Sequence, residues 1–242
     1  MVGSLARVIV RRATRFWTVS VARRTEYGRV WDSVSQSRDD ARRAVAGYAD
    51  EEEWARSGRE TAQDIATETG LRPDDVVLEI GCGAARVGVH LAPRCARWIG
   101  CDVSAGMLAH ARTALAGHAN VSFVHLDGNG LDGVADTSVD VVYCTTVFMH
   151  LEEWDRYRYV REAFRVLKPG GRFYVDSFSL RSPQGWALFE QLAALPPLAR
   201  PPHISKASTP QELETYVQHA GFTSVRVREG DLYVTVVAER PR

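Results

Sequence analysis

The stretch that most constrains this chain is an apolar run at residues 76–80 that leads directly into two glycines, Gly81 and Gly83. An alanine-rich helical pattern follows at once, so the local order is strand, tight turn and helix. Glycines let the backbone turn sharply and leave room for a ligand, and the free N–H groups at a helix start favour a polar or anionic ligand group. This stretch therefore predicts a cofactor site.

A dinucleotide site is one alternative for such a turn. It would place a small residue three positions after the second glycine, where the helix packs on the strand, but Arg86 stands there. A nicotinamide-dependent oxidoreductase would explain an acid at Asp102, but neither Glu79 before the turn nor Asp127 after a later strand. We therefore disfavour this class.

Acidic residues end the next two predicted strands. Residues 97–102 form a short strand that ends at Asp102, 19 positions after Gly83. This is close to the spacing at which a strand-end acid accepts hydrogen bonds from ribose hydroxyls. The third strand ends in Asp127 and Gly128, although an Asp at such a place can also be a simple turn former. The two acids together favour a cofactor that carries a nucleoside.

The remaining pattern completes an α/β fold. Strands are predicted at 140–146, 172–178, 223–228 and 232–239, and one long amphipathic helix is predicted at 152–167. We expect a three-layer, doubly wound, seven-stranded and mainly parallel sheet with an antiparallel C-terminal edge strand, plus an N-terminal helical extension. The fourth strand should neighbour the first, so its carboxyl end and the following residues 147–151 should face the switch-point crevice.

Five segments in order give the chain a family resemblance: E-I-G-C-G at 79–83, G-C-D at 100–102, L-D-G at 126–128, the fourth strand with its following residues, and L-K-P-G-G at 167–171. Together they resemble the class I S-adenosylmethionine (SAM) dependent methyltransferases of the small-molecule type. The resemblance implies SAM as cofactor, S-adenosylhomocysteine as product and no metal. It implies cofactor contacts from Glu79, Gly81, Cys82, Gly83, Asp102, Val103, Met107, Asp127, Gly128, Cys144 and Thr145.

Methyl transfer from a sulfonium is an in-line displacement, so the protein mainly has to align donor and acceptor and exclude water. When the acceptor is a hydroxyl, removal of its proton lowers the barrier. His150 follows the fourth strand, and the unperturbed pKa of histidine suits this role. The alternative is that His150 only packs or hydrogen-bonds there. Asp176, at the outer end of the fifth strand, and His203 are the next candidates.

The composition and the absence of certain motifs restrict the class of substrate. The 30 basic and 30 acidic residues give a net charge of zero, which argues against a chain built mainly to hold phosphate backbones. The fourth strand ends in C-T-T-V and not in the N-P-P-Y type of base methyltransferases. We therefore expect methylation of a small molecule on a hydroxyl group, and we disfavour an RNA methyltransferase. A SAM-fold protein that binds the cofactor but acts as a non-methylating catalyst or a partner subunit stays open.

We divide the chain into a basic N-terminal extension (1–25), a helical cap (26–70) and a SAM-binding domain (71–242), with a Pro-broken insertion at 181–209 as a substrate lid. The extension has arginines and no acid before Glu26 but no apolar run of membrane-spanning length. Weak membrane-surface contact is one role for it. The four cysteines form no C-x-x-C pair, so we expect a cytoplasmic protein that is at most peripheral at the membrane. We expect a monomer or a homodimer.

Overall fold

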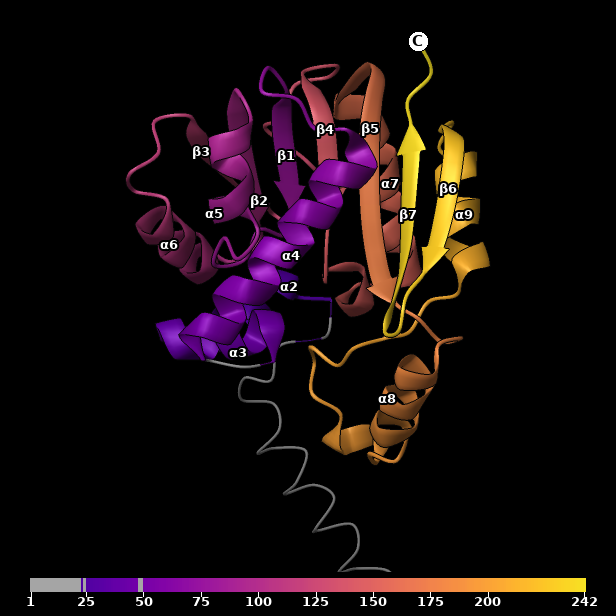
Figure 1. Cartoon of the computed structure of the whole chain (residues 1–242). Helices are drawn as coiled ribbons and strands as arrows, with labels where there is room; N and C mark the ends of the chain where they lie inside the picture. Colours follow the sequence, from indigo (N-terminus) through magenta and orange to yellow (C-terminus); the bar gives the residue numbers. More distant parts are fainter. Residues whose placement is uncertain (1–22, 24, 48–49) are drawn as a thin grey trace, which may run out of the picture.

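The computed structural model describes residue 23 and residues 25–47 and 50–242. Most of the predicted basic extension (1–25), and with it the predicted membrane contact, lies outside these residues. The described chain forms one seven-stranded sheet with helices on both faces (Figure 1).

The strands are β1 (Val76–Ile80), β2 (Arg97–Asp102), β3 (Val121–His125), β4 (Val139–Cys144), β5 (Leu167–Phe178), β6 (Thr223–Glu229) and β7 (Tyr233–Glu239). The α-helices are α2 (Tyr27–Ser33), α3 (Arg38–Ala46), α4 (Glu51–Thr69), α5 (Gly88–Leu91), α6 (Ala105–Ala114), α7 (Glu153–Val166), α8 (Pro183–Ala193) and α9 (Pro210–His219). Short 3₁₀ helices are η1 (Ala92–Arg94), η2 (Phe148–His150) and η3 (Pro197–Ala199).

The strands lie in the order β3-β2-β1-β4-β5-β7-β6. β1 pairs in parallel with both β2 and β4, and β7 runs antiparallel between β5 and β6. The chain order reverses at β1, so the carboxyl ends of β1 and β4 flank the switch point, where ligands bind in sheets of this kind. The predicted doubly wound, seven-stranded sheet is confirmed, with its antiparallel strand β7 just inside the edge strand β6.

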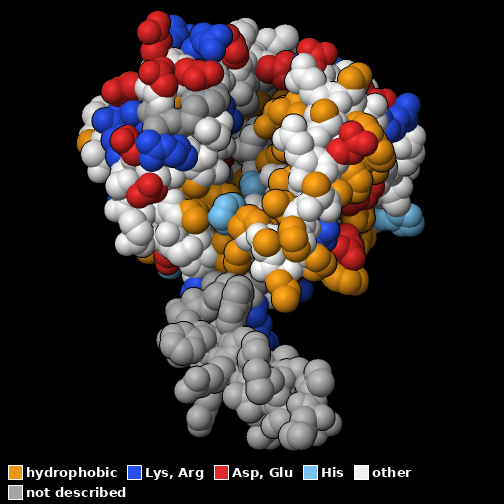
Figure 2. Space-filling model, turned by 90° about the horizontal axis from the view of Figure 1, so that it is seen from below, with side chains coloured by type: hydrophobic (Ala, Val, Ile, Leu, Met, Phe, Trp, Pro, Cys, Tyr) orange, Lys and Arg blue, Asp and Glu red, His pale blue; other side chains and the backbone are white. Residues whose placement is uncertain are grey.

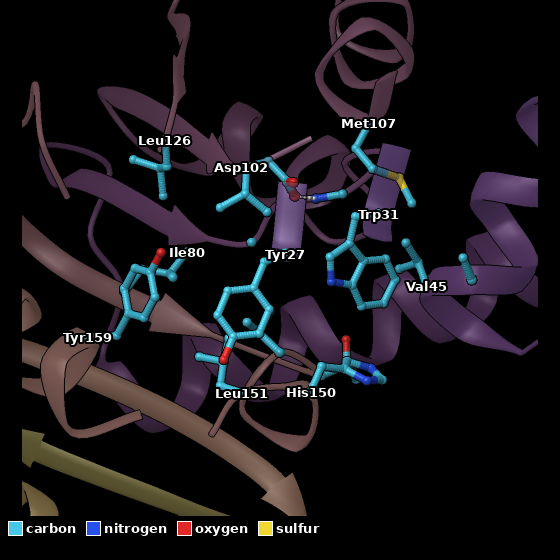
Figure 3. Close-up of a pocket in the computed structure, with 16 residues that line it drawn as sticks. Tyr27, Trp31, Val45, Ile80, Asp102, Met107, Leu126, His150, Leu151 and Tyr159 are labelled. Carbon is cyan, nitrogen blue, oxygen red and sulfur yellow. Dashed lines mark hydrogen bonds between the residues drawn. The ribbon is translucent and has the colours of Figure 1, made fainter. Parts of the chain in front are cut away.

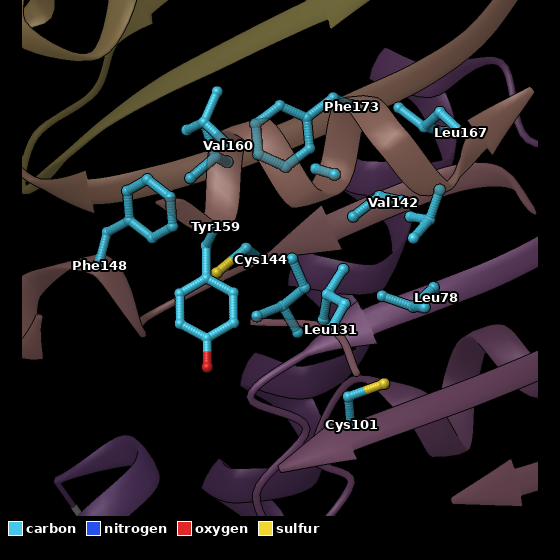
Figure 4. Packing of buried hydrophobic residues seen from close by; sticks show 14 of the residues in the cluster. Leu78, Cys101, Leu131, Val142, Cys144, Phe148, Tyr159, Val160, Leu167 and Phe173 are labelled. Carbon is cyan, nitrogen blue, oxygen red and sulfur yellow. The ribbon is translucent and has the colours of Figure 1, made fainter. Parts of the chain in front are cut away.

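The sheet is covered on both faces because successive residues of its strands point to opposite sides. On one face Val77 and Val141 pack in a cluster with Ile65 of α4 and Leu108 of α6. On the other face a larger cluster packs against α7 and α9, and Figure 4 shows part of it around α7. Both layers of helices are therefore held by apolar contacts to the same central strands.

Two predicted boundaries differ from the structure. The helix predicted directly after Gly83 begins only at Gly88 and passes after four residues into η1, whose first turn contains Pro93. Proline has no N–H to donate, so an α-helix does not continue through it. The segment L-K-P-G-G at 167–171, which joins the predicted helix 152–167 to the predicted strand 172–178, lies within β5. Leu167 already pairs with Val139 there, before the register shifts.

Of the N-terminal helices, α2 and α3 lie at the carboxyl ends of the strands, and α4 runs diagonally across one face of the sheet (Figure 1). Helix α4 begins at Asp50, whose side chain accepts a hydrogen bond from the Glu53 N–H at 2.8 Å, and it ends at Gly70 in the left-handed conformation. The acidic residues of its first turn favour this helix start through the helix dipole.

The packing around Trp98 gives a test of this core. The indole ring is fully buried, and a Cβ at Gly100 would lie 2.3 Å from its Cη2 atom. We expect Gly100→Ala to lower the free energy of unfolding by about 1–3 kcal/mol, because overpacking displaces the ring or the strand. Urea unfolding measures this, with Gly117→Ala as control, since no atom lies within 4 Å of its Cβ position. Equal stability of the two variants would show that the sheet absorbs the added methyl group.

Candidate active site

The glycine turn between β1 and α5 has a conformation and a clearance that only glycine provides. Gly81 and Gly83 have φ angles of 69° and 50°, in the left-handed region that glycine adopts at little cost. A Cβ at Gly81 would lie 2.3 Å from a methyl group of Val147, and one at Gly83 would lie 2.9 Å from a methyl group of Val45. The turn is therefore pressed between the residues that follow β4 and the end of α3.

Asp102, at the end of β2, fixes this turn through its carboxylate. Oδ2 accepts the Gly83 N–H at 2.8 Å, and Oδ1 accepts the Ser104 N–H at 2.9 Å. The side chain is buried, and this burial raises its pKa to about 6 despite the two backbone hydrogen bonds. The same carboxylate lines a cavity beside the turn. Because each carboxylate oxygen has two lone pairs, it can accept further hydrogen bonds from a ligand.

Glu79 lies one layer deeper, beneath the turn. Its carboxylate accepts a hydrogen bond from the Tyr143 hydroxyl, which in turn accepts the Trp98 Nε1–H at 3.0 Å. Burial raises the pKa of Glu79 to about 8. Glu79 is not among the residues that line the cavities described below. Glu79 thus lies behind the glycine turn, and its predicted cofactor contact stays a prediction.

A small cavity lies over the carboxyl ends of β1 and β2 and is roofed by α2 (Figure 3). Its floor includes Gly81, Gly83, Asp102, Val103 and Met107, and Tyr27 and Trp31 of α2 close it from the other side. It encloses only about 70 Å³, much less than the roughly 300 Å³ of a typical ligand pocket.

Helix α2 is fastened at both of its ends. The Tyr27 hydroxyl donates to Asp155 at 2.7 Å and accepts the Glu152 N–H at 3.1 Å. The Asp32 carboxylate accepts the Ser104 hydroxyl at 2.6 Å and the Gly106 N–H at 3.2 Å. The roof is therefore bound to the start of α7 at one end and to the start of α6 at the other.

A larger cavity of about 730 Å³ lies beside the first, below the ends of β4, β5 and β7. Thr145, Asp176 and Tyr174 line its sheet side, and Leu188 and His203 of the 181–209 insertion line the opposite side. Seen from below, the molecule is hollowed on this face, with hydrophobic and histidine side chains around the hollow (Figure 2). The two cavities share the lining residues Ala44, Val45, Thr146 and His150.

His150 therefore stands where the two cavities meet. Its Nδ1 lies 2.9 Å from the carbonyl oxygen of His203. Since a carbonyl oxygen only accepts, Nδ1 must carry the proton, and Nε2 is then the unprotonated nitrogen. The Trp31 ring packs edge-on against the imidazole, with 4.8 Å between ring centroids. Burial lowers the pKa of His150 to about 4, so the ring is neutral at physiological pH.

Thr146, the residue after the predicted cofactor contact Thr145, has an unusual backbone. Its φ angle is 58°, which is a genuine outlier for a β-branched residue. The Asp176 carboxylate stabilises this conformation, because it accepts the Thr146 N–H at 2.7 Å and the Thr145 hydroxyl. Burial raises the pKa of Asp176 to about 6. Asp176 thus shapes the end of β4 as well as lining the larger cavity.

The structure does not bring every predicted residue to the cavities. Asp127 is exposed, and its carboxylate accepts the Asn129 N–H at 2.8 Å in a local turn, which lowers its pKa. With Gly128 it borders a separate groove against the start of α2. Cys82 and Cys144 are buried and are not among the residues that line the two cavities. For these four residues a cofactor contact stays a prediction.

Sequence reasoning also missed several lining residues. Tyr27 and Trp31 lie some 50 positions before the glycine turn, and no local motif marks them. Thr146 and Tyr159 follow β4, and only the fold shows that they face the ligand side. The one available signal was the aromatic pair in a short polar helix, four residues apart and so on one helix face.

Known proteins resemble the central part of this chain. Residues 77–171 match the family model of a methyltransferase domain. A probable SAM-dependent methyltransferase of Mycolicibacterium smegmatis is 37% identical over 136 residues, 56% of this chain and 49% of that protein. A ubiquinone biosynthesis O-methyltransferase of Pseudomonas fluorescens is 30% identical over 152 residues, 61% of this chain and 64% of that protein. A crystal structure of a SAM-dependent methyltransferase from Thermotoga maritima matches with a TM-score of 0.60 at 21% identity, covering 78% of this chain and 93% of that one.

The chain carries a class I SAM-dependent methyltransferase domain. The strand order and the family match agree on this, and SAM is the cofactor of the family. The chain spans only about half to two thirds of the curated relatives described above. No helix in the described part of this methyltransferase chain is long and apolar enough to cross a membrane.

The small cavity fits SAM by the chemistry of its lining. Asp102 offers acceptors for the two ribose hydroxyls, and Val103 and Met107 offer apolar sides for the adenine. The glycines of the turn place no side chain in the way, so the amino-acid end of SAM can approach its backbone closely. Because the enclosed space is only about 70 Å³, the cavity has to widen when an adenosyl group enters. The residues present thus match the cofactor in their chemistry.

Glu79 gives a pH test of the support beneath the site. Its pKa is raised from 4.5 to about 8, so the folded protein binds more protons than the unfolded chain between these values. Stability from this group therefore falls as the pH rises. We expect Glu79→Gln, which keeps an acceptor for Tyr143, to gain stability relative to wild type from about pH 5 to about pH 8.

Urea unfolding across this range measures the difference. Glu52→Gln, which removes an exposed carboxyl of α4, is the matched control. If the wild type and Glu79→Gln keep a constant difference over the range, Glu79 is ionised in the folded protein.

Proposed function

We propose that this chain methylates a hydroxyl group of a small, moderately apolar molecule, with SAM as the donor and His150 as the general base. The observation that carries the proposal is the place of His150, which lines both cavities and whose Nε2 is left unprotonated by the bond of Nδ1 to the His203 carbonyl. The small cavity takes the cofactor and the larger one takes the acceptor. The similarity to the Pseudomonas fluorescens ubiquinone biosynthesis O-methyltransferase supports this choice.

SAM, when bound, supplies an electrophilic methyl group whose leaving group is S-adenosylhomocysteine. The residues of the chain have to place the acceptor oxygen in line with that methyl group and take up its proton. In our proposal the hydroxyl proton passes to Nε2 of His150, while the Nδ1–H stays bonded to the His203 carbonyl. That bond holds the ring in one tautomer and one orientation.

The environment of His150 selects among hydroxyl acceptors. Its lowered pKa of about 4 makes the imidazole a weak base, and a weak base transfers protons best from an acidic group. A phenol, with an ordinary pKa near 10 in the case of tyrosine, is therefore favoured over an aliphatic alcohol. The insertion 181–209 is proposed as the substrate lid, since Leu188, His203 and Ser205 close the larger cavity.

Cofactor binding is the first test. We expect S-adenosylhomocysteine to bind in calorimetry with unchanged affinity after addition of a chelator, because the proposed contacts are carboxylate, backbone and apolar groups. Asp102→Asn, which keeps the side-chain volume, should weaken binding by about tenfold or more, through loss of charge-assisted hydrogen bonds worth about 1.5–3 kcal/mol. Binding that vanishes with the chelator, or that Asp102→Asn leaves intact, would contradict the assignment.

The base is tested by the pH dependence of S-adenosylhomocysteine formation with a panel of phenols. If His150 is the base, the acidic limb follows its pKa of about 4, and the rate is flat above about pH 5. His150→Gln should lower turnover by about 10²-fold or more with little change in cofactor affinity.

Asp176 provides the matched comparison, because its pKa is about 6. An acidic limb near this value that disappears in Asp176→Asn, with a normal rate for His150→Gln, would assign the base to Asp176. Binding of cofactor without any product across the panel would favour the non-methylating alternative.

A further inference from the structure

Arg86, which follows the glycine turn, is a buried cation without a counter-ion. The residue is only 6% exposed, and it lines the larger cavity. Nη1 donates weakly to the hydroxyls of Ser57 and Thr61, at 3.4 and 3.2 Å, and Nε has no hydrogen-bond partner. Among the described residues no carboxylate lies within the 4.0 Å of an ion pair with it.

Such an arrangement is costly for the protein on its own. Burial of a charge is unfavourable unless the charge is paired and fully hydrogen-bonded. Other buried arginines of the described chain have an ion-pair partner: Arg156 pairs with Glu212 at 2.8 Å, and Arg42 pairs with Glu51 at 2.9 Å. Arg86 differs from both because its direct partners are neutral hydroxyls. The guanidinium of Arg86 therefore has no ion-pair partner among the described residues.

The neighbouring acids do not fill this role. Glu79 and Asp176 are near enough for the charge of Arg86 to lower their pKa values somewhat, yet burial raises both overall. Glu79 is hydrogen-bonded by Tyr143, and Asp176 by Thr145 and Thr146, and neither carboxylate forms an ion pair with Arg86. Arg86 consequently lines the larger cavity with its charge unpaired and with a buried Nε that has no hydrogen-bond partner.

We propose that Arg86 is the anion-binding residue of the larger cavity and pairs there with the carboxylate of a bound ligand. The guanidinium fork suits a carboxylate because two parallel N–H groups can bond its two oxygens. This inference rests on the proposed function, in which the cofactor and acceptor meet at this cavity. Two molecules of that reaction can carry the carboxylate: SAM, at its amino-acid end, or an acidic acceptor.

Stability and affinity should move in opposite directions when the charge is removed. Arg86→Met keeps an unbranched side chain but no charge, so we expect the ligand-free variant to melt at or above the wild-type temperature. Ser57 and Thr61 keep their bonds to the Trp54 and Ser57 carbonyls in the variant. A merely structural Arg86 would instead give a variant that melts below wild type. Arg94→Met, at an exposed position of the same segment, is the control.

Calorimetry with two pairs of ligands distinguishes a carboxylate of the cofactor from a carboxylate of the acceptor. The first pair is S-adenosylhomocysteine and its decarboxylated analogue, which lacks only the carboxylate. The second is 4-hydroxybenzoate and 4-hydroxybenzyl alcohol, each added to protein saturated with S-adenosylhomocysteine. We expect Arg86→Met to weaken the carboxylate member of one pair by about tenfold or more and to spare its partner. An effect in the first pair assigns the cofactor, and an effect in the second assigns the acceptor.

Arg86→Lys should recover part of the lost affinity, because the ammonium group supplies the charge but not the planar fork. Equal effects on both members of a pair, or no effect in either pair, would overturn the proposal. These readouts require binding and melting only. A failure of methyl transfer would therefore leave them unchanged, and the two proposals can fail separately.

Discussion

The site depends first on the carboxylate of Asp102. It joins the end of β2, the glycine turn after β1 and the start of α6 through two short hydrogen bonds to backbone N–H groups. Ser104, one of these donors, also bonds Asp32 of the roof helix α2 through its hydroxyl. Removal of this carboxylate would leave buried N–H groups unpaired, which is expensive for the fold. One acid therefore holds the floor of the small cavity in place and connects it to the roof.

Much of the fold could be predicted because its signals are local. The apolar run 76–80, the two glycines and the strand-end acid at Asp102 each follow from short-range chemistry, and the order of these segments determines the sheet. The short helix α5 was predicted too early, since the turn geometry up to residue 87 is set by close contacts with α3 and the residues after β4.

The cavity walls were harder to predict, because they come from segments that are distant in sequence. The sequence predicts a helical cap at 26–70, but apart from the aromatic pair itself it does not indicate that Tyr27 and Trp31 face the carboxyl ends of the strands. Asp127 shows the opposite case: its strand-end position is as expected, but its carboxylate turns to Asn129 and solvent. The direction of a side chain at a strand end depends on the following turn, which strand periodicity does not define. The left-handed backbone of Thr146 is likewise a product of its bonds to Asp176.

The roof helix has a kinetic consequence. Because α2 is bonded to α7 through Tyr27 and to α6 through Asp32, an adenosyl group that enters or leaves beneath α2 has to open at least one of these contacts. Lid opening of this kind commonly limits turnover in enzymes with fast chemistry. Helix α2 has only seven residues, and so short a helix is held by its tertiary bonds more than by its own propensity. In the proposed function, the stability of these two contacts would set how long S-adenosylhomocysteine is retained after each reaction, and so the rate at which the next molecule of SAM can bind.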